Sequence, residues 1–204
     1  MRKLAIILAV ATLAVAPAMA QSKKDVQNAR TEAKAAAKTL RRDGFKPLEL
    51  GDVTTRLEKY FLKQYAGCTQ VIGTADGCLT TNLAQVTALA NAANLYALTA
   101  GGEVRARIVS SASSLSGQQI DNLVSSFERL VAKEIRGELV PFVTLVRDRK
   151  GHVDARAYCI VDLDGACQLR KRALEIALEE QALAEKYGTM VSEWIDEGFN
   201  KEEE

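Results

Sequence analysis

The chain has 204 residues, of which 48% are hydrophobic and 26% are charged, a composition typical of a globular protein. Lys and Arg together number 27 and Asp and Glu 26, so the formal net charge of +1 argues against a strongly basic nucleic-acid-binding protein. With 5% aromatic residues and a single His, the chain also offers few surfaces for base stacking and few metal ligands. Its length suits one domain.

The N-terminal residues have the pattern of a secretory signal peptide. A basic start, Met1 to Lys3, precedes an apolar run from Leu4 to Val15, and Ala18 to Ala20 has the small-x-small pattern that signal peptidase recognises. The run is shorter than the about 20 residues that cross a bilayer, and no Cys that could carry a lipid follows it. We therefore expect residues 1–20 to be cleaved after Ala20, giving a periplasmic or secreted bacterial protein without a membrane span or lipid anchor. Cleavage changes the formal net charge from +1 to −1.

Residues 21–64 are predicted to form an N-terminal helical extension. Asp25 to Arg42 is rich in strong helix formers and is followed by a glycine that favours a helix end. Pro47 makes the next residues an extended connector. Asp52 has the position of an N-cap, and the apolar spacing after it predicts a second helix over Val53 to Gln64.

Residues 65–204 are predicted to form an α+β domain that begins with a strand over Tyr65 to Thr74. A long Ala-rich helix follows, and its stripe of mostly small residues predicts that a sheet face approaches it closely. Gly101-Gly102 would either break this helix or permit a very tight contact. The expected stripe consists of Leu83, Val86, Ala90, Ala93, Ala97, Ala100 and Val104.

The second half of the domain combines helices with a hairpin. Another amphipathic helix is marked by Ile120, Leu123, Val124, Phe127, Leu130 and Val131. Leu139 to Arg147 and Val153 to Leu163 then flank a short connection and predict antiparallel strands, one face buried and the other wet. A final long helix is expected over Cys167 to Gly198. The predicted fold is a small, mainly antiparallel three-stranded sheet with long helices packed on one face.

Two segments resemble a known family. Gln70-Val71-Ile72-Gly73-Thr74-Ala75 precedes the helix with Ala90, Ala93 and Ala97, and the hairpin with Gly151 and Tyr158-Cys159-Ile160-Val161 precedes the closing helix. Over about residues 65–183 this pattern is similar to small bacterial outer-membrane lipoproteins whose members include a flagellar basal-disk lipoprotein. The resemblance implies a three-stranded sheet packed by helices, a non-enzymatic role in the envelope and no catalytic residues. The chain departs from the family by lacking its lipid-bearing Cys.

The four cysteines, Cys68, Cys78, Cys159 and Cys167, are candidates for disulfides because an even number in an exported protein favours bridges. The local pairing joins Cys68 to Cys78 and Cys159 to Cys167. The other pairing weighed, natural if the two strands are neighbours, joins Cys68 to Cys159 and Cys78 to Cys167. A metal or redox site is disfavoured because there is no Cys-x-x-Cys and no second His.

No motif for catalysis or for cofactor binding stands out, and the single His, His152, is expected at a hairpin tip. We therefore expect an exported, non-enzymatic protein of the cell envelope, without cofactor or metal, that acts through contact with a protein partner or with itself. The expected contact surfaces are the open face of the sheet and the N-terminal helix. The alternative is a periplasmic binding module that holds a small apolar or peptide ligand between sheet and helices. An enzyme using only carboxylates is a third interpretation.

Overall fold

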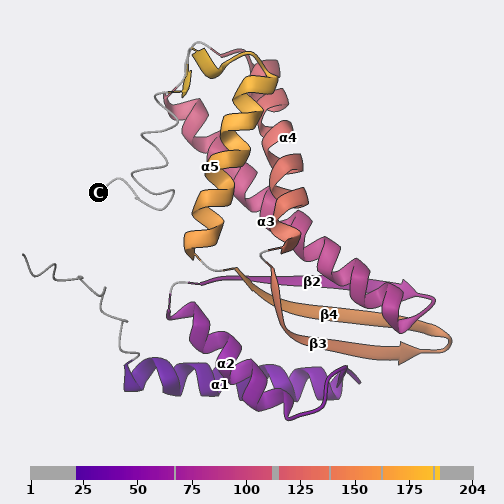
Figure 1. Cartoon of the computed structure of the whole chain (residues 1–204). Coiled ribbons are helices and arrows are strands. Elements are labelled where there is room, and N and C mark those ends of the chain that lie inside the picture. The colour runs from indigo at the N-terminus through magenta and orange to yellow at the C-terminus, as the bar shows by residue number, and fades with distance from the viewer. Residues whose placement is uncertain are drawn as a thin grey trace, which may run out of the picture.

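The computed structural model describes residues 22–66, 68–111, 115–137, 139–161, 163–185 and 187–188. The described residues form five α-helices and a four-stranded antiparallel sheet, so the predicted α+β class is confirmed (Figure 1). The signal peptide expected over 1–20 lies outside this part of the chain. The elements are α1 (Lys23–Arg42), β1 (Lys46–Pro47), α2 (Val53–Gln64), β2 (Thr69–Cys78), α3 (Thr81–Ser111), α4 (Gly117–Glu134), a 3-10 turn (Ile135–Gly137), β3 (Val140–Arg149), β4 (His152–Val161) and α5 (Leu163–Glu180).

The sheet has one strand more than the three predicted, in the order β1-β3-β4-β2. The additional strand is the connector that contains Pro47, which pairs antiparallel with Leu145 while Lys46 pairs with Val146. Leu48 N–H donates to the Thr144 carbonyl at 2.9 Å, so the backbone of Pro47, one position earlier, points away from β3. Proline therefore costs this edge strand no ladder hydrogen bond.

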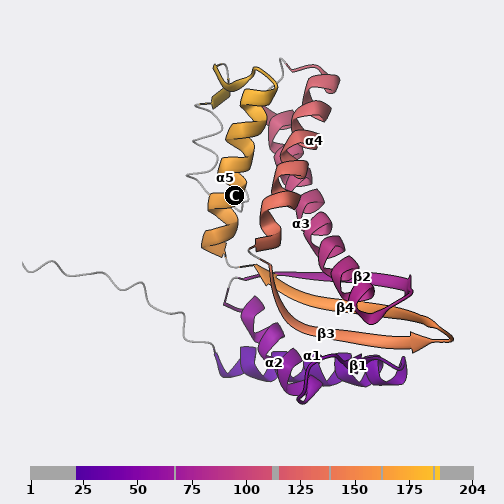
Figure 2. The same cartoon turned by 45° about the vertical axis from the view of Figure 1, so that its right-hand side comes forward.

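Helices cover both faces of the sheet, which corrects the prediction of helices on one face. Figures 1 and 2 show α1 and α2 beneath the sheet, whereas α3, α4 and α5 lie on the opposite face, with α4 and α5 upright and α3 oblique. The face of β4 that was expected to be wet is mostly buried because α1 and α2 cover it, and its polar residues have partners there. Tyr158 packs edge-on against Tyr60 of α2 at 5.3 Å between ring centroids, and Asp154 binds Arg147.

Residues 22–64 thus form a layer of the fold and not an extension from it. Ser22 and Asp25 form a capping box at the start of α1, and Asp52 caps α2 through the Thr55 N–H, as predicted. The side chains on the buried side of α1 are mostly alanines, so this helix can lie close to α2. The buried residues of this layer include Ala33, Ala37, Leu40, Leu57 and Tyr60, together with Val143, Leu145 and Tyr158 of the sheet.

The predicted stripe of α3 is confirmed at Ala93, Ala97, Ala100 and Val104 but is wrong at its start, and a sheet face does approach this helix closely. One row of buried residues recurs at every fourth position, and Ala93 and Ala97 beside it are buried too; the row consists of Ala84, Ala88, Ala92, Tyr96, Ala100, Val104 and Ile108. With 3.6 residues per turn, such a row winds around the helix by about 40° per step. The drift fits a helix that first lies on the sheet and then rises beside α4 and α5, while Leu83 and Val86 stay exposed (Figure 1).

The glycine pair in α3 does not break the helix. The helix continues to Ser111, and a Cβ on Gly101 would overlap the carboxyl group of Glu128 in α4. Gly102 faces open space. The close contact that the sequence analysis offered as one of two outcomes is therefore the one observed. The apolar residues predicted for α4 are all buried: Ile120, Leu123, Val124, Phe127, Leu130 and Val131.

The last long helix ends earlier than the predicted Gly198. It stops at Glu180, and Ala182 follows with a φ of 54°. Leu183 N–H donates to the Leu178 carbonyl and Ala182 N–H to the Glu179 carbonyl, which is the Schellman pattern of helix ends. The same pattern ends α1, where Gly44 has a φ of 83°. The same C-terminal cap is therefore formed by Gly44 in α1 and by Ala182 in α5.

Replacing Ala182 by Gly is expected to stabilise the protein by about 1 kcal/mol, because a left-handed backbone strains any residue that has a Cβ. The reverse change at the matched cap, Gly44→Ala, is expected to destabilise the protein by a similar amount. Urea unfolding of both variants measures these differences. Equal stability of the Ala182→Gly variant and the wild type would contradict the assigned cap.

Candidate interaction surface

Strand β2 is the longer of the two edge strands of the sheet. Its only neighbour is β4, with Thr69 opposite Val161 and Ala75 opposite Ala155, and a bulge follows before Cys78. The strand lies at the end of the order β1-β3-β4-β2, so in the described part of the chain no strand covers its outer side. A strand was expected here over Tyr65 to Thr74; the observed strand is shifted by four residues, and its place at an edge was not predicted.

The hydrogen-bond register shows which backbone groups face that free side. Leu48 N–H donates to the Thr144 carbonyl, so the backbone of Thr144 points toward β1. Because this direction alternates along a strand, Leu145 points toward β4, and its partner Arg156 points back toward β3. Thr74 lies opposite Arg156 on the other side of β4. Its N–H and C=O therefore point away from β4, toward the free side.

By the same alternation, Gln70 and Ile72 also direct their N–H and C=O groups outward. The Thr74 carbonyl accepts a hydrogen bond from Asn91 Nδ2 of α3 at 2.7 Å, which satisfies one lone pair of that oxygen. Strand residues Thr69 to Ala75, here named the neutral edge, contain no Pro, Lys or Arg. Such residues are the usual protection of edge strands against pairing with another chain.

The opposite edge of the sheet has that protection. There β1 is two residues long and consists of Lys46 and Pro47. Its short length, its charge and its proline all discourage further pairing. The two edges of one sheet thus differ in the features that decide whether a strand can be added.

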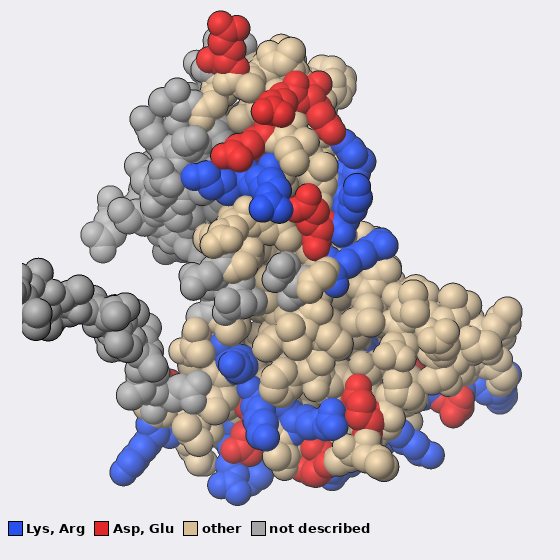
Figure 3. Space-filling view, in the orientation of Figure 1, with Lys and Arg blue, Asp and Glu red and all other residues tan. Residues whose placement is uncertain are grey.

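The surface next to the neutral edge is also uncharged. Asp76 is the one charged residue between Thr69 and Gly102 in the sequence. Figure 3 shows a broad area without Lys, Arg, Asp or Glu over the beginning of α3, in contrast to the charges along the lower layer. Several large apolar side chains of this region are exposed: Ile72, Leu79, Leu83, Val86, Leu95 and Leu98.

The contact surfaces predicted from the sequence are largely covered. The small apolar side of α1 packs within the lower layer, with Ala29, Ala33 and Ala37 buried. On the sheet, α1 and α2 cover most of the face that was expected to be open, but Ile72 of β2 remains 40% exposed and Thr74 is exposed as well. Only the β2 part of the predicted open face is therefore accessible.

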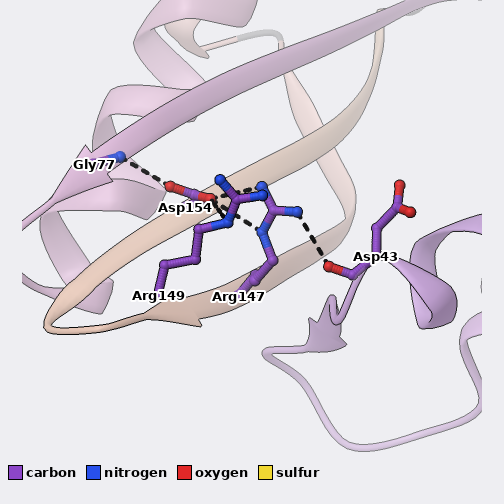
Figure 4. A network of polar contacts seen from close by, with 5 residues as sticks. All are labelled: Asp43, Gly77, Arg147, Arg149 and Asp154. Carbon is purple, nitrogen blue, oxygen red and sulfur yellow. Dashed lines mark hydrogen bonds and ion pairs between the residues drawn. The ribbon is translucent and has the colours of Figure 1, made fainter.

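The buried carboxylate of Asp154 connects the β3–β4 hairpin to β2 through hydrogen bonds (Figure 4). Asp154 Oδ1 accepts from the Gly77 N–H at 2.9 Å, and Oδ2 accepts from Arg147 Nη2 at 2.7 Å. Arg147 Nη1 in turn donates to the Asp43 carbonyl at 3.1 Å. The hydrogen bond from Gly77, followed by Arg147, holds the pKa of Asp154 below its usual range. A carboxylate held ionised by such partners is suited to fixing strands and not to proton transfer.

A second buried cluster joins α3 to α5. Arg170 Nε donates to the Tyr96 hydroxyl at 2.9 Å, and Arg170 Nη1 lies 2.6 Å from Glu103 Oε2. The guanidinium carbon lies 4.9 Å from the Tyr96 ring centroid, a cation–π distance. Burial raises the pKa of Tyr96. The Tyr96 hydroxyl therefore stays protonated at neutral pH and acts as a hydrogen-bond partner.

The cysteines are unpaired in the structure, and their positions exclude most of the pairings weighed from the sequence. Cys68 and Cys78 are separated by the length of β2, roughly 30 Å for an extended strand of this size, whereas bridged Cα atoms lie within about 7 Å. Cys159 lies opposite Val71, so Cys68 is displaced from it by about 10 Å along the strand.

Cys167 lies early in α5, which follows the end of β4 opposite the hairpin, whereas Cys78 pairs with Val153 at the hairpin end (Figure 1). Of the four bridges weighed, Cys159 to Cys167 is the one that these positions do not exclude. Neither of the two complete pairings weighed from the sequence fits these positions, because each contains a bridge between cysteines that lie too far apart.

The thiol of Cys159 is expected to be the slowest of the four to react in the reduced protein. It is buried, and burial raises its pKa to about 11, which leaves little thiolate at pH 8. The other three cysteines are half-buried. Ellman titration of the native reduced wild type should therefore give a fast phase from the other three thiols, and the Cys159 thiol should react only after denaturant is added. The fast phase should be unchanged in Cys159→Ala. A smaller fast phase in that variant would contradict the burial of Cys159.

Comparison of the chain with protein-family models, with curated proteins and with solved structures gave no match. Among the described residues, no helix combines the length and the apolar character needed to cross a membrane. In the same part of the chain, His, Cys, Asp and Glu side chains form no group of three that could bind a metal ion.

Proposed function

We propose that this chain is an exported, non-enzymatic protein of the bacterial cell envelope that acts through protein–protein contact at the neutral edge. The neutral edge, an uncharged stretch of seven residues at the free side of β2, is the observation that carries this proposal. An edge of this kind binds an added strand through main-chain hydrogen bonds, and alternate side chains such as Ile72 supply selectivity. Export is supported by the signal-peptide pattern of residues 1–20.

The alternative, a ligand held between the sheet and α3, has less support. A Cβ on Gly73 would overlap the Ala88 carbonyl oxygen and lie 2.7 Å from the Ala92 nitrogen. The helix backbone therefore rests directly on β2 at this point, and no space is left there for a ligand. Contact at the outer side of β2 requires no such space.

The test uses the full chain with its own leader, produced in a bacterial host with a photo-crosslinking amino acid at Ile72. Irradiation should give crosslinked species of higher mass in the envelope fraction. The matched control carries the same group at Val26 in α1, which has the same 40% exposure. Sequencing of the mature N-terminus should begin at Gln21. Absence of products from position 72, or equal products from both positions, would contradict contact at the neutral edge.

A further inference from the structure

We propose that the partner of the neutral edge is a second copy of this chain, bound by antiparallel pairing of β2 with β2 about a two-fold axis at Ile72. The inference rests on the proposed function, since it needs the neutral edge to be a contact surface. Pairing of this kind would join two four-stranded sheets into one continuous sheet. A two-fold contact uses the same surface on both copies, so that surface must be complementary to itself.

The backbone groups of the neutral edge meet this requirement. Gln70, Ile72 and Thr74 all point outward, as the register of β2 on β4 shows. When two copies pair antiparallel about Ile72, Ile72 lies opposite Ile72 of the second copy, and Gln70 lies opposite Thr74 of the second copy. Each of these residues then faces a residue whose N–H and C=O point back toward it. The Thr74 carbonyl, which already accepts from Asn91 Nδ2, has its second lone pair for the added strand.

The side chains on the lower face match in the same register. Ile72 is 40% exposed in one copy, and it would be covered by the same side chain of the other copy. Gln70 and Thr74, both polar and uncharged, would form the flanking cross-strand pairs. In this register a residue that follows Ile72 by four positions faces the residue that precedes Ile72 by four positions in the second copy. Asp76 would therefore face the Cys68 position and not a second carboxylate. No like charges therefore meet along the pairing.

The charge of Asp76 and the bounds of the regular strand also favour this register over those centred on Thr74 or Gln70. Moving the axis to Thr74 would place Asp76 opposite Ile72 and bring the bulge after Ala75 into the pairing. Moving the axis to Gln70 would pair residues that precede Thr69, where the strand begins. The register centred on Ile72 uses the regular part of β2 and leaves the bulge outside.

The experiment measures the mass of the purified mature chain by sedimentation over about 1 to 100 µM, a range that brackets weak to moderate association. Wild type should approach the mass of a dimer. Ile72→Lys should weaken association on the order of a hundredfold, because two like charges would meet at the axis. Val26→Lys adds the same charge at a site of the same 40% exposure and should leave the dimer unchanged. Circular dichroism melts should show that both variants fold.

A second variant tests the register. In Ile72→Cys the two thiols would lie across a hydrogen-bonded pair with Cα atoms about 5.5 Å apart, within the range of a disulfide. Mild oxidation with dissolved dioxygen and a copper catalyst should convert this variant to a covalent dimer faster than Val26→Cys or wild type. A wild type that stays monomeric, or a dimer that survives Ile72→Lys, would overturn the proposal. A crosslink from Ile72 to a different protein, with a monomeric pure chain, would overturn the dimer and leave the proposed function standing.

Discussion

Replacing Gly73 by Ala is expected to destabilise the protein by about 3 kcal/mol, because the added methyl group meets helix backbone and not a movable side chain. Its Cβ would overlap the Ala88 carbonyl oxygen and lie 2.8 Å from the Ala92 Cβ. To remove this overlap, the first turns of α3 would have to move away from β2. Urea unfolding followed by circular dichroism measures the loss.

The matched control is Gly102→Ala in α3. No atom lies within 4 Å of the Cβ that this change would add, so only helix propensity changes, and a gain of about 1 kcal/mol is expected. Opposite signs for the two Gly→Ala changes would support the close seating of α3 on β2. A loss below about 0.5 kcal/mol for Gly73→Ala, the usual size for a surface change, would contradict it.

Patterns of large apolar residues at regular spacing were interpreted correctly from the sequence. The apolar residues of α4 are all buried, because Leu, Ile, Val and Phe at steps of three and four leave one side of the helix for the core. The N-cap at Asp52 was also found, since a short acidic side chain before an apolar run has a specific hydrogen-bonding role there.

The orientation of α3 was predicted less well because its buried residues are mostly alanines. An interpretation that favours large side chains places Leu83 and Val86 in the core, yet both are exposed. Close contact with the sheet at Gly73 needs small residues on the helix, so the larger ones face outward. The end of α5 was missed for a related reason. Its left-handed position holds Ala182, where the sequence offers no glycine as a signal.

The neutral edge could be found only in part from the sequence. The absence of charge between Thr69 and Ala75 is visible in the sequence, but the position of β2 at the end of the sheet depends on strand order. The crossover through α3 and α4 sets that order, and local patterns do not encode it. The local cysteine pairing fails for a different reason: β2 continues to Cys78 and does not end at Thr74 as expected, so Cys68 and Cys78 lie at the two ends of one strand.

Asp154→Asn is expected to destabilise the protein by about 3 kcal/mol at pH 7, because it leaves Arg147 in a mostly buried position without its anionic partner. The Asp154 side chain is 5% exposed, and that of Arg147 is 16% exposed. Asp121→Asn is the matched control. Asp121 pairs with Arg105 at 2.6 Å, but its side chain is 54% exposed, and the loss should stay below about 1 kcal/mol.

The pH dependence of this difference tests the charge of Asp154 directly. Hydrogen bonding and Arg147 lower the pKa of Asp154 in the folded protein, so the stabilisation is fully present above the unfolded pKa of about 3.9 and is lost as the pH falls through the lower folded value. The gap in unfolding free energy between wild type and Asp154→Asn should therefore be constant from pH 7 to about 5 and shrink below pH 4. A gap that stays constant into acid would mean that shape, and not charge, makes Asp154 important at the junction of β2, β3 and β4.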